Sequence, residues 1–85
     1  MKITLDIPDY DVTTGLKVKW EEGFEIITNS GNGSTTILAN RAGLISLANI
    51  LLNLSQETVP SGSHIHLDDL NSLESGSVEL ILVKK

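Results

Sequence analysis

The sequence contains no cysteine, which excludes a disulfide framework, a thiolate zinc site, an iron–sulfur cluster and a cysteine nucleophile. Aromatic residues are scarce, so the core must be built from aliphatic side chains. No apolar run approaches the roughly 18 residues that a membrane-spanning helix needs. The N-terminus lacks the uninterrupted apolar region of a secretory signal peptide. We therefore expect a soluble, cytoplasmic protein.

The 85 residues fit one domain, 1–85, rather than two. A chain of this length buries only about 60–65% of the surface that its unfolded form exposes. A homodimer that buries further apolar surface is therefore plausible.

Lysine and arginine are absent from the span Ala42–Val83, whereas the whole chain has a net charge of −5. Such a span repels nucleic acid and anionic membranes, because binding to phosphate needs clustered lysine and arginine. It attracts basic protein surfaces and speeds their encounter. The alternative is that these carboxylates are ordinary solubilising surface. The acidic residues of the span are Glu57, Asp68, Asp69, Glu74 and Glu79.

Short segments of alternating polar and apolar residues predict β-strands. The last segment is apolar on both faces, which is typical of an interior strand. The glycine-rich stretch 29–34 is typical of a hairpin loop. The predicted strands cover residues 2–7, 16–20, 24–28, 35–39, 63–68 and 77–83.

One helix is predicted over Arg41–Gln56, with Asn40 as its N-cap. Nearly all of its surface is apolar, so it needs cover from a sheet face and, beyond that, from a flanking loop or a second subunit. We expect Gly43 to permit close approach to a strand. The element order ββββαββ predicts an α+β fold: an antiparallel sheet of five to six strands with one helix packed on one face. The only polar stripe of the helix comprises Ser46, Asn49, Asn53 and Gln56.

The run His64-Ile65-His66-Leu67-Asp68 is the most distinctive local pattern. A spacing of two places both imidazoles and the Asp68 carboxylate on one strand face. Two such histidines could chelate a metal ion, but a catalytic zinc site needs a third protein ligand, from Asp68 or Glu79. We expect a polar face for protein contact instead, with no metal and no cofactor.

Enzymatic activity is not expected. Ser63, His64 and Asp68 are the residue types of a nucleophilic triad, but neighbours on a strand point to opposite faces, so Ser63 cannot bond well to His64. The Gly31-Asn32-Gly33 stretch lacks the following Lys-Ser/Thr of a phosphate loop. We therefore assign no catalytic residue.

The single tryptophan, Trp20, is expected in the core.

Three stretches carry a resemblance to the immunity protein 32 family of bacterial polymorphic toxin systems. Residues 40–48 (NRAGLISLA) resemble the strand-to-helix junction of that family, and 59–68 (VPSGSHIHLD) and 71–81 (NSLESGSVELI) resemble its second and third signatures. Together they cover about half of the chain, in its C-terminal half. The resemblance implies a small intracellular protein that binds a co-encoded toxin domain and blocks it.

An acidic protein of this kind suits a basic toxin, such as a nuclease with a basic cleft. We expect occlusion without catalysis, and a possible homodimer seam along the helix Arg41–Gln56. Two alternatives remain: a homodimeric structural or regulatory protein without a toxin partner, and a metal- or ligand-binding module on the His64/His66 face. The residues expected to contact the partner are Glu57, His64, His66, Asp68, Asp69 and Glu74.

Overall fold

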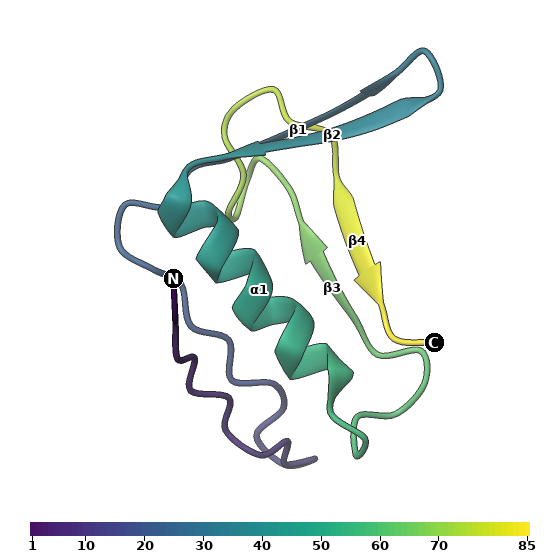
Figure 1. Cartoon of the computed structure of the whole chain (residues 1–85). Coiled ribbons are helices and arrows are strands. Elements are labelled where there is room, and N and C mark those ends of the chain that lie inside the picture. Colours follow the sequence, from purple (N-terminus) through teal and green to yellow (C-terminus); the bar gives the residue numbers. More distant parts are fainter.

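The computed structural model describes all 85 residues as an α+β fold with one helix and two antiparallel hairpins (Figure 1). The structure contains no helix with the length and hydropathy of a membrane span. The expected single sheet of five to six strands is wrong, because the four strands form two separate two-stranded sheets. The elements are β1 (Ile26–Gly31), β2 (Ser34–Ala39), α1 (Arg41–Ser55), β3 (His64–Leu67) and β4 (Leu80–Val83).

The first hairpin, β1–β2, confirms the expected glycine-rich turn but is longer than expected. Its strands pair in register from Ile26↔Ala39 to Gly31↔Ser34, so only Asn32 and Gly33 form the turn. Both turn residues have positive φ, 52° and 78°. This is the requirement of a type I′ turn, whose twist matches that of the flanking strands.

Helix α1 begins where the sequence predicts. The Asn40 side chain accepts a hydrogen bond from the Gly43 N–H, as an N-cap does, and it also accepts one from the Glu25 N–H. Gly43 permits close approach to β1, as expected: a Cβ there would lie 2.5 Å from the Glu25 carbonyl oxygen and 2.9 Å from Ile26 Cγ1. The first turn of the helix therefore rests directly on the start of the hairpin.

The second hairpin, β3–β4, is shorter than the segments 63–68 and 77–83 predicted for it. Residues before Leu80 do not pair with β3. They bond to the free edge of β1 instead: the Glu74 N–H donates to the Ile26 carbonyl and the Val78 N–H to the Thr28 carbonyl. The expectation of an interior last strand is wrong, because β4 pairs with β3 alone.

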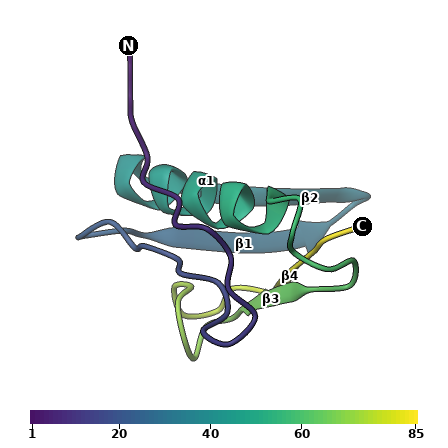
Figure 2. The ribbon, with the colours of Figure 1, turned by 90° about the horizontal axis from the view of Figure 1, so that it is seen from below.

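Residues 1–25 contain none of the predicted strands; an isolated bridge between Asp11 and Gly15 is their one strand-like pairing. Hydrogen bonds from the Thr13 side chain and backbone lower the pKa of Asp11 in that turn. The segment lies along α1 (Figure 2), and helix side chains accept its backbone N–H groups. The three bonds run from Tyr10 to Gln56 (2.8 Å), from Lys19 to Asn49 (2.9 Å) and from Glu21 to Ser46 (2.8 Å).

The polar stripe of α1 therefore lies inside the molecule. Ser46, Asn49 and Asn53 are at most 3% exposed. The flanking N-terminal segment covers this polar side, whereas leucines on the outer side of the helix remain uncovered. The exposed fractions of Leu44, Leu51 and Leu52 are 56%, 52% and 45%. Unlike an ordinary surface helix, α1 thus buries its polar stripe together with Leu47, Ile50 and Leu54 and leaves other leucines exposed.

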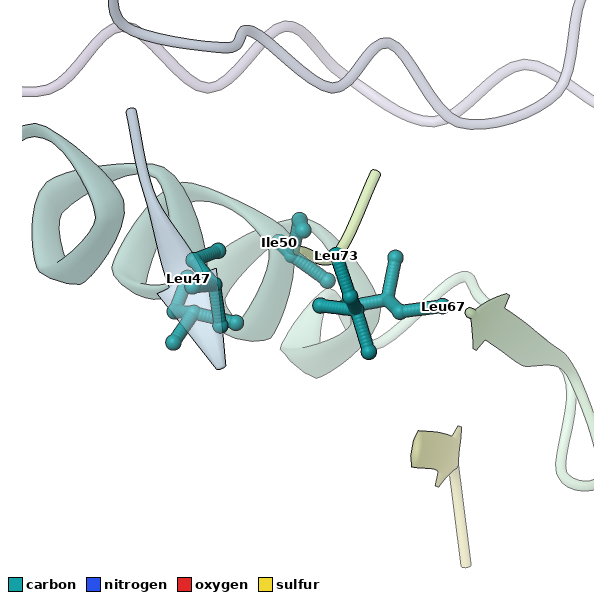
Figure 3. Close-up of a cluster of buried hydrophobic side chains, with 5 residues drawn as sticks. Leu47, Ile50, Leu67 and Leu73 are labelled. Atoms are coloured by element: carbon teal, nitrogen blue, oxygen red, sulfur yellow. The ribbon is translucent and has the colours of Figure 1, made fainter. Parts of the chain in front are cut away.

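The core lies between α1, β1 and the second hairpin. In Figure 3, Leu73, from the connection between β3 and β4, lies beside Ile50 of α1 and Leu67 of β3. Trp20 is only half-buried and stacks on Phe24, with ring centroids 4.5 Å apart, so it packs at the edge of the core and not within it. The buried cluster comprises Ile26, Leu47, Ile50, Leu67 and Leu73.

Lys84 supplies the cation that the end of α1 lacks. The last turn of the helix contains no basic residue, and Lys84 Nζ donates to the Gln56 carbonyl at 2.6 Å. A cation at a helix C-terminus stabilises it by about 0.3–1 kcal/mol. We expect Lys84→Met to lower the free energy of unfolding in urea by about 1 kcal/mol. The control Lys85→Met removes the same charge from the neighbouring residue. An equal loss of unfolding free energy in that control would contradict the role given to Lys84 at the end of α1.

Candidate functional site

The connection between β3 and β4, residues 68–79, is the most acidic part of the chain and is called the acidic loop here. Its two ends meet, because Leu67 pairs with Leu80 at the mouth of the hairpin. Compact loops of this kind with adjacent ends are frequently functional. The loop contains no basic residue, and its carboxylates are Asp68, Asp69, Glu74 and Glu79.

The acidic loop is fixed to the body of the protein at its middle and at its far end. Leu73 is 5% exposed and packs in the core, and the next residue bonds through its backbone to Ile26. Further along, Ser77 Oγ accepts the Thr28 N–H, and Thr28 Oγ1 donates to the Val78 carbonyl. The carboxylates are therefore presented by a backbone with a defined course.

Asp68 organises the loop. Its carboxylate accepts the backbone N–H groups of Leu70 and Asn71, at 2.9 and 3.1 Å. Its own N–H donates to the Asn71 side chain. A carboxylate that accepts local N–H groups in this way stabilises a turn. Asp68 was expected to share the strand face of the histidines, but β3 ends at Leu67 and Asp68 begins the turn.

The remaining carboxylates of the loop have few intramolecular partners. Asp69 accepts one long hydrogen bond, 3.4 Å from the Gly76 N–H, and the Glu74 side chain makes no hydrogen bond or ion pair. Glu79 Oε2 lies 3.2 Å from His66 Nδ1, and this is the only contact within 4.0 Å between a carboxylate oxygen and a basic side-chain nitrogen. No lysine or arginine nitrogen therefore lies within 4.0 Å of any carboxylate oxygen.

His64 and His66 share the outer face of β3, as the sequence predicts. Their rings meet edge to face with centroids 4.9 Å apart, and both are exposed. His64 Nδ1 lies 3.1 Å from the Gly62 carbonyl oxygen. The structure gathers no group of three or more histidine, aspartate or glutamate side chains in a metal-binding arrangement. Both rings can therefore offer nitrogen atoms to a partner beside the acidic loop.

Glu57 lies apart from the other expected contact residues. It follows the last turn of α1, whereas the acidic loop follows the far end of β3. Figure 1 shows these two points at opposite ends of the molecule. Of the expected contact residues, His64 and His66 thus lie on β3 and Asp68, Asp69 and Glu74 lie in the loop that follows it, whereas Glu57 is separate from them.

An open cleft of about 340 Å³ adjoins the acidic loop, and sequence reasoning missed it. The N-terminal segment forms one wall and β3 with the start of the loop forms the other. The alternation of Leu16, Val18 and Trp20 is the available signal, but this pattern predicts a strand of the core equally well. Nearby, Leu70 on the loop is 93% exposed. The cleft is lined by Leu16, Val18, Trp20, Ile50, Ile65, His66, Leu67, Asn71 and Ser72.

The chain is thus a small α+β protein whose C-terminal half presents an acidic loop beside a mainly apolar cleft. A family model described as "Immunity protein 32" matches residues 34–85, from β2 to the C-terminus. The chain belongs to the immunity protein 32 family, which confirms the resemblance seen in its motifs. Searches of curated proteins and of solved structures gave no match. The matched region contains the whole acidic loop, whereas one wall of the cleft lies outside it.

Proposed function

We propose that this protein neutralises a co-encoded toxin by binding and occluding a basic surface of the toxin domain. Membership of an immunity protein family supports a toxin as the partner. The observation that carries the proposed mode of binding is the acidic loop, in which four carboxylates lie within twelve residues without a lysine or arginine partner. Catalysis plays no part: the toxin is blocked because its surface is covered.

Two physical effects make the acidic loop suitable for this task. Its carboxylates, none of which contacts a lysine or arginine, attract a basic partner over long range, which raises the association rate and favours partners of opposite charge. A defined loop backbone also loses little conformational entropy on binding, which leaves more of the interaction energy as affinity.

The cleft offers apolar contacts, which charge attraction alone does not provide. A few buried apolar or aromatic anchors dominate the energy of most protein interfaces. The cleft beside the loop can receive such an anchor from the toxin, and the exposed Leu70 side chain can in turn pack against the toxin surface. His66 lines the cleft and pairs with Glu79, so it joins the apolar and the acidic parts of the site.

The test is a charge reversal in the loop with a control of equal charge change elsewhere. We expect Glu74→Lys to weaken binding to the toxin at least about tenfold, mainly through a slower association rate. Glu74 is the best choice because its side chain makes no contact that the fold needs, whereas reversal of Asp68 would disrupt the loop. Glu57→Lys changes the net charge equally at the other end of the molecule.

Calorimetry with the purified toxin and rescue of toxin-expressing cells are the two measurements. Rescue and salt-sensitive binding should weaken together for Glu74→Lys and change little for Glu57→Lys. Equal losses in both variants would mean that only net charge matters and not this loop. Failure of the unmodified protein to rescue cells would refute the proposed function as a whole.

A further inference from the structure

The outer edge of β2 carries backbone hydrogen-bonding groups without partners. The two-residue turn makes Gly31↔Ser34 a hydrogen-bonded pair, and bonded pairs alternate along an antiparallel ladder. Ser34, Thr36 and Leu38 therefore bond to β1. The N–H and C=O groups of Thr35, Ile37 and Ala39 point away from β1, where β2 has no neighbouring strand. Consistent with this alternation, Ile26 and Thr28 of β1 bond outward, to the acidic loop.

This edge lacks the usual protection against pairing with another chain. Natural edge strands are guarded by charged residues, proline or bulges. Residues 26–40 contain no charged residue and no proline, and the register of β1 and β2 is uninterrupted. Six residues of β2 thus form a regular and unguarded edge.

Uncovered aliphatic side chains accompany the edge. Ile37 and Leu38 on β2 are 43% and 63% exposed, and Leu44 in the first turns of α1 is 56% exposed. Figure 2 shows α1 and β2 on one side of the molecule and the acidic loop with β3 and β4 on the other. Ile37 and Leu38 point to opposite faces of β2, so aliphatic side chains flank its unpaired edge on both faces, which favours pairing with another chain.

We infer that this surface binds a second copy of the chain, edge to edge through β2, in a two-fold symmetric homodimer. A two-fold axis at Ile37 places it opposite Ile37 of the second copy and places Thr35 opposite Ala39. All three outward-facing residues of each strand then pair at once, because the set is self-complementary in an antiparallel ladder. The two hairpins become one four-stranded sheet, and both α1 helices lie on the same face of it.

Charge favours a second copy over the basic toxin as the occupant. The β2 strand has no carboxylate that could attract a basic protein. Two chains of net charge −5 can also meet here without local repulsion, because β2 carries no charged side chain. The acidic loops stay on the far side of each subunit (Figure 2). Dimer formation therefore leaves both loops accessible and is independent of the proposed function.

Sedimentation equilibrium of the full chain, from low micromolar to near-millimolar concentration, tests the inference. We expect a monomer–dimer equilibrium whose dissociation constant rises at least about tenfold in Leu44→Lys and in Ile37→Pro, because each substitution acts twice across the axis. Proline at position 37 removes only an outward N–H, so the bonds between β1 and β2 survive. Circular dichroism establishes that both variants are folded.

The matched control is Val83→Lys on β4, where an aliphatic side chain of similar exposure, 61%, is replaced by the same charge. It should leave the dimer intact. Amide exchange adds a second readout: the N–H groups of Thr35, Ile37 and Ala39 should become protected as concentration rises. A monomer at every concentration, equal dissociation by Val83→Lys, or a folded Ile37→Pro variant that still dimerises as tightly would each overturn the inference.

Discussion

Replacement of Asn49 by leucine is expected to lower the free energy of unfolding by about 2–3 kcal/mol, although it makes the helix more apolar. Asn49 is 3% exposed, and its Oδ1 accepts the Lys19 N–H and the Asn53 Nδ2, both at 2.9 Å. Leucine accepts neither, which leaves the Lys19 N–H without its partner, whereas Asn53 Nδ2 keeps its bond to the Asn49 carbonyl at 3.0 Å. A buried donor left without a partner costs about 1–3 kcal/mol, which outweighs the gain from one more apolar side chain.

The measurement is urea denaturation of Asn49→Leu beside Ser55→Leu. Ser55 is a polar residue of the same helix but is exposed, and its hydroxyl bonds only within the helix, to the Leu52 carbonyl. Leucine at position 55 should therefore change stability by no more than about 0.5 kcal/mol. If Asn49→Leu were as stable as the parent protein, the polar side of α1 would not be holding the N-terminal segment.

The N-terminal segment explains why the sequence predicted strands that do not form. The alternation of Leu16, Val18 and Trp20 correctly indicates an extended chain with one apolar side, since Val18 and Trp20 pack against the core. Alternation does not specify what receives the backbone hydrogen bonds. Here helix side chains at Ser46 and Asn49 receive them in place of a neighbouring strand. An extended segment bonded to a helix has the same sequence pattern as a strand.

Local chemistry was predicted well and long-range pairing was not. Asn40 as N-cap, a hairpin loop within residues 29–34 and the shared face of His64 and His66 all follow from rules that span a few residues. The division into two sheets depends on where residues 74–78 bond, which is settled by the buried Leu73 and by Thr28 far away in the sequence. No local pattern contains that information.

For the candidate site, too, the sequence predicted local features but not those that depend on long-range contacts. The lack of lysine and arginine between residues 42 and 83 indicated an acidic surface in the second half of the chain, because charge is read directly from the sequence. The structural role of Asp68, however, depends on turn geometry, and the separation of Glu57 depends on the direction of α1 relative to β3. The cleft could not be predicted because its two walls are far apart in the chain.

Gly43→Ala is expected to destabilise the protein by about 2–3 kcal/mol, although helix propensity alone predicts the opposite effect. Alanine in place of glycine within a helix normally stabilises by about 1 kcal/mol. At this position the added Cβ would lie 2.5 Å from the Glu25 carbonyl oxygen and 3.1 Å from the Cβ of Ala39. The carbonyl cannot move freely, because it accepts the Asn40 N–H at 3.1 Å, next to the N-cap of the helix.

The control is Gly31→Ala, the same chemical change at the end of β1, where a Cβ would meet nothing within 4 Å and φ is not positive. There the substitution should be neutral or stabilise by up to about 1 kcal/mol, because it restricts the unfolded chain. The urea midpoint of Gly43→Ala should therefore fall, whereas that of Gly31→Ala should rise or stay unchanged. Equal midpoints would mean that α1 can shift away from β1 at little cost, and the position of the helix over the hairpin would then not be fixed by this contact.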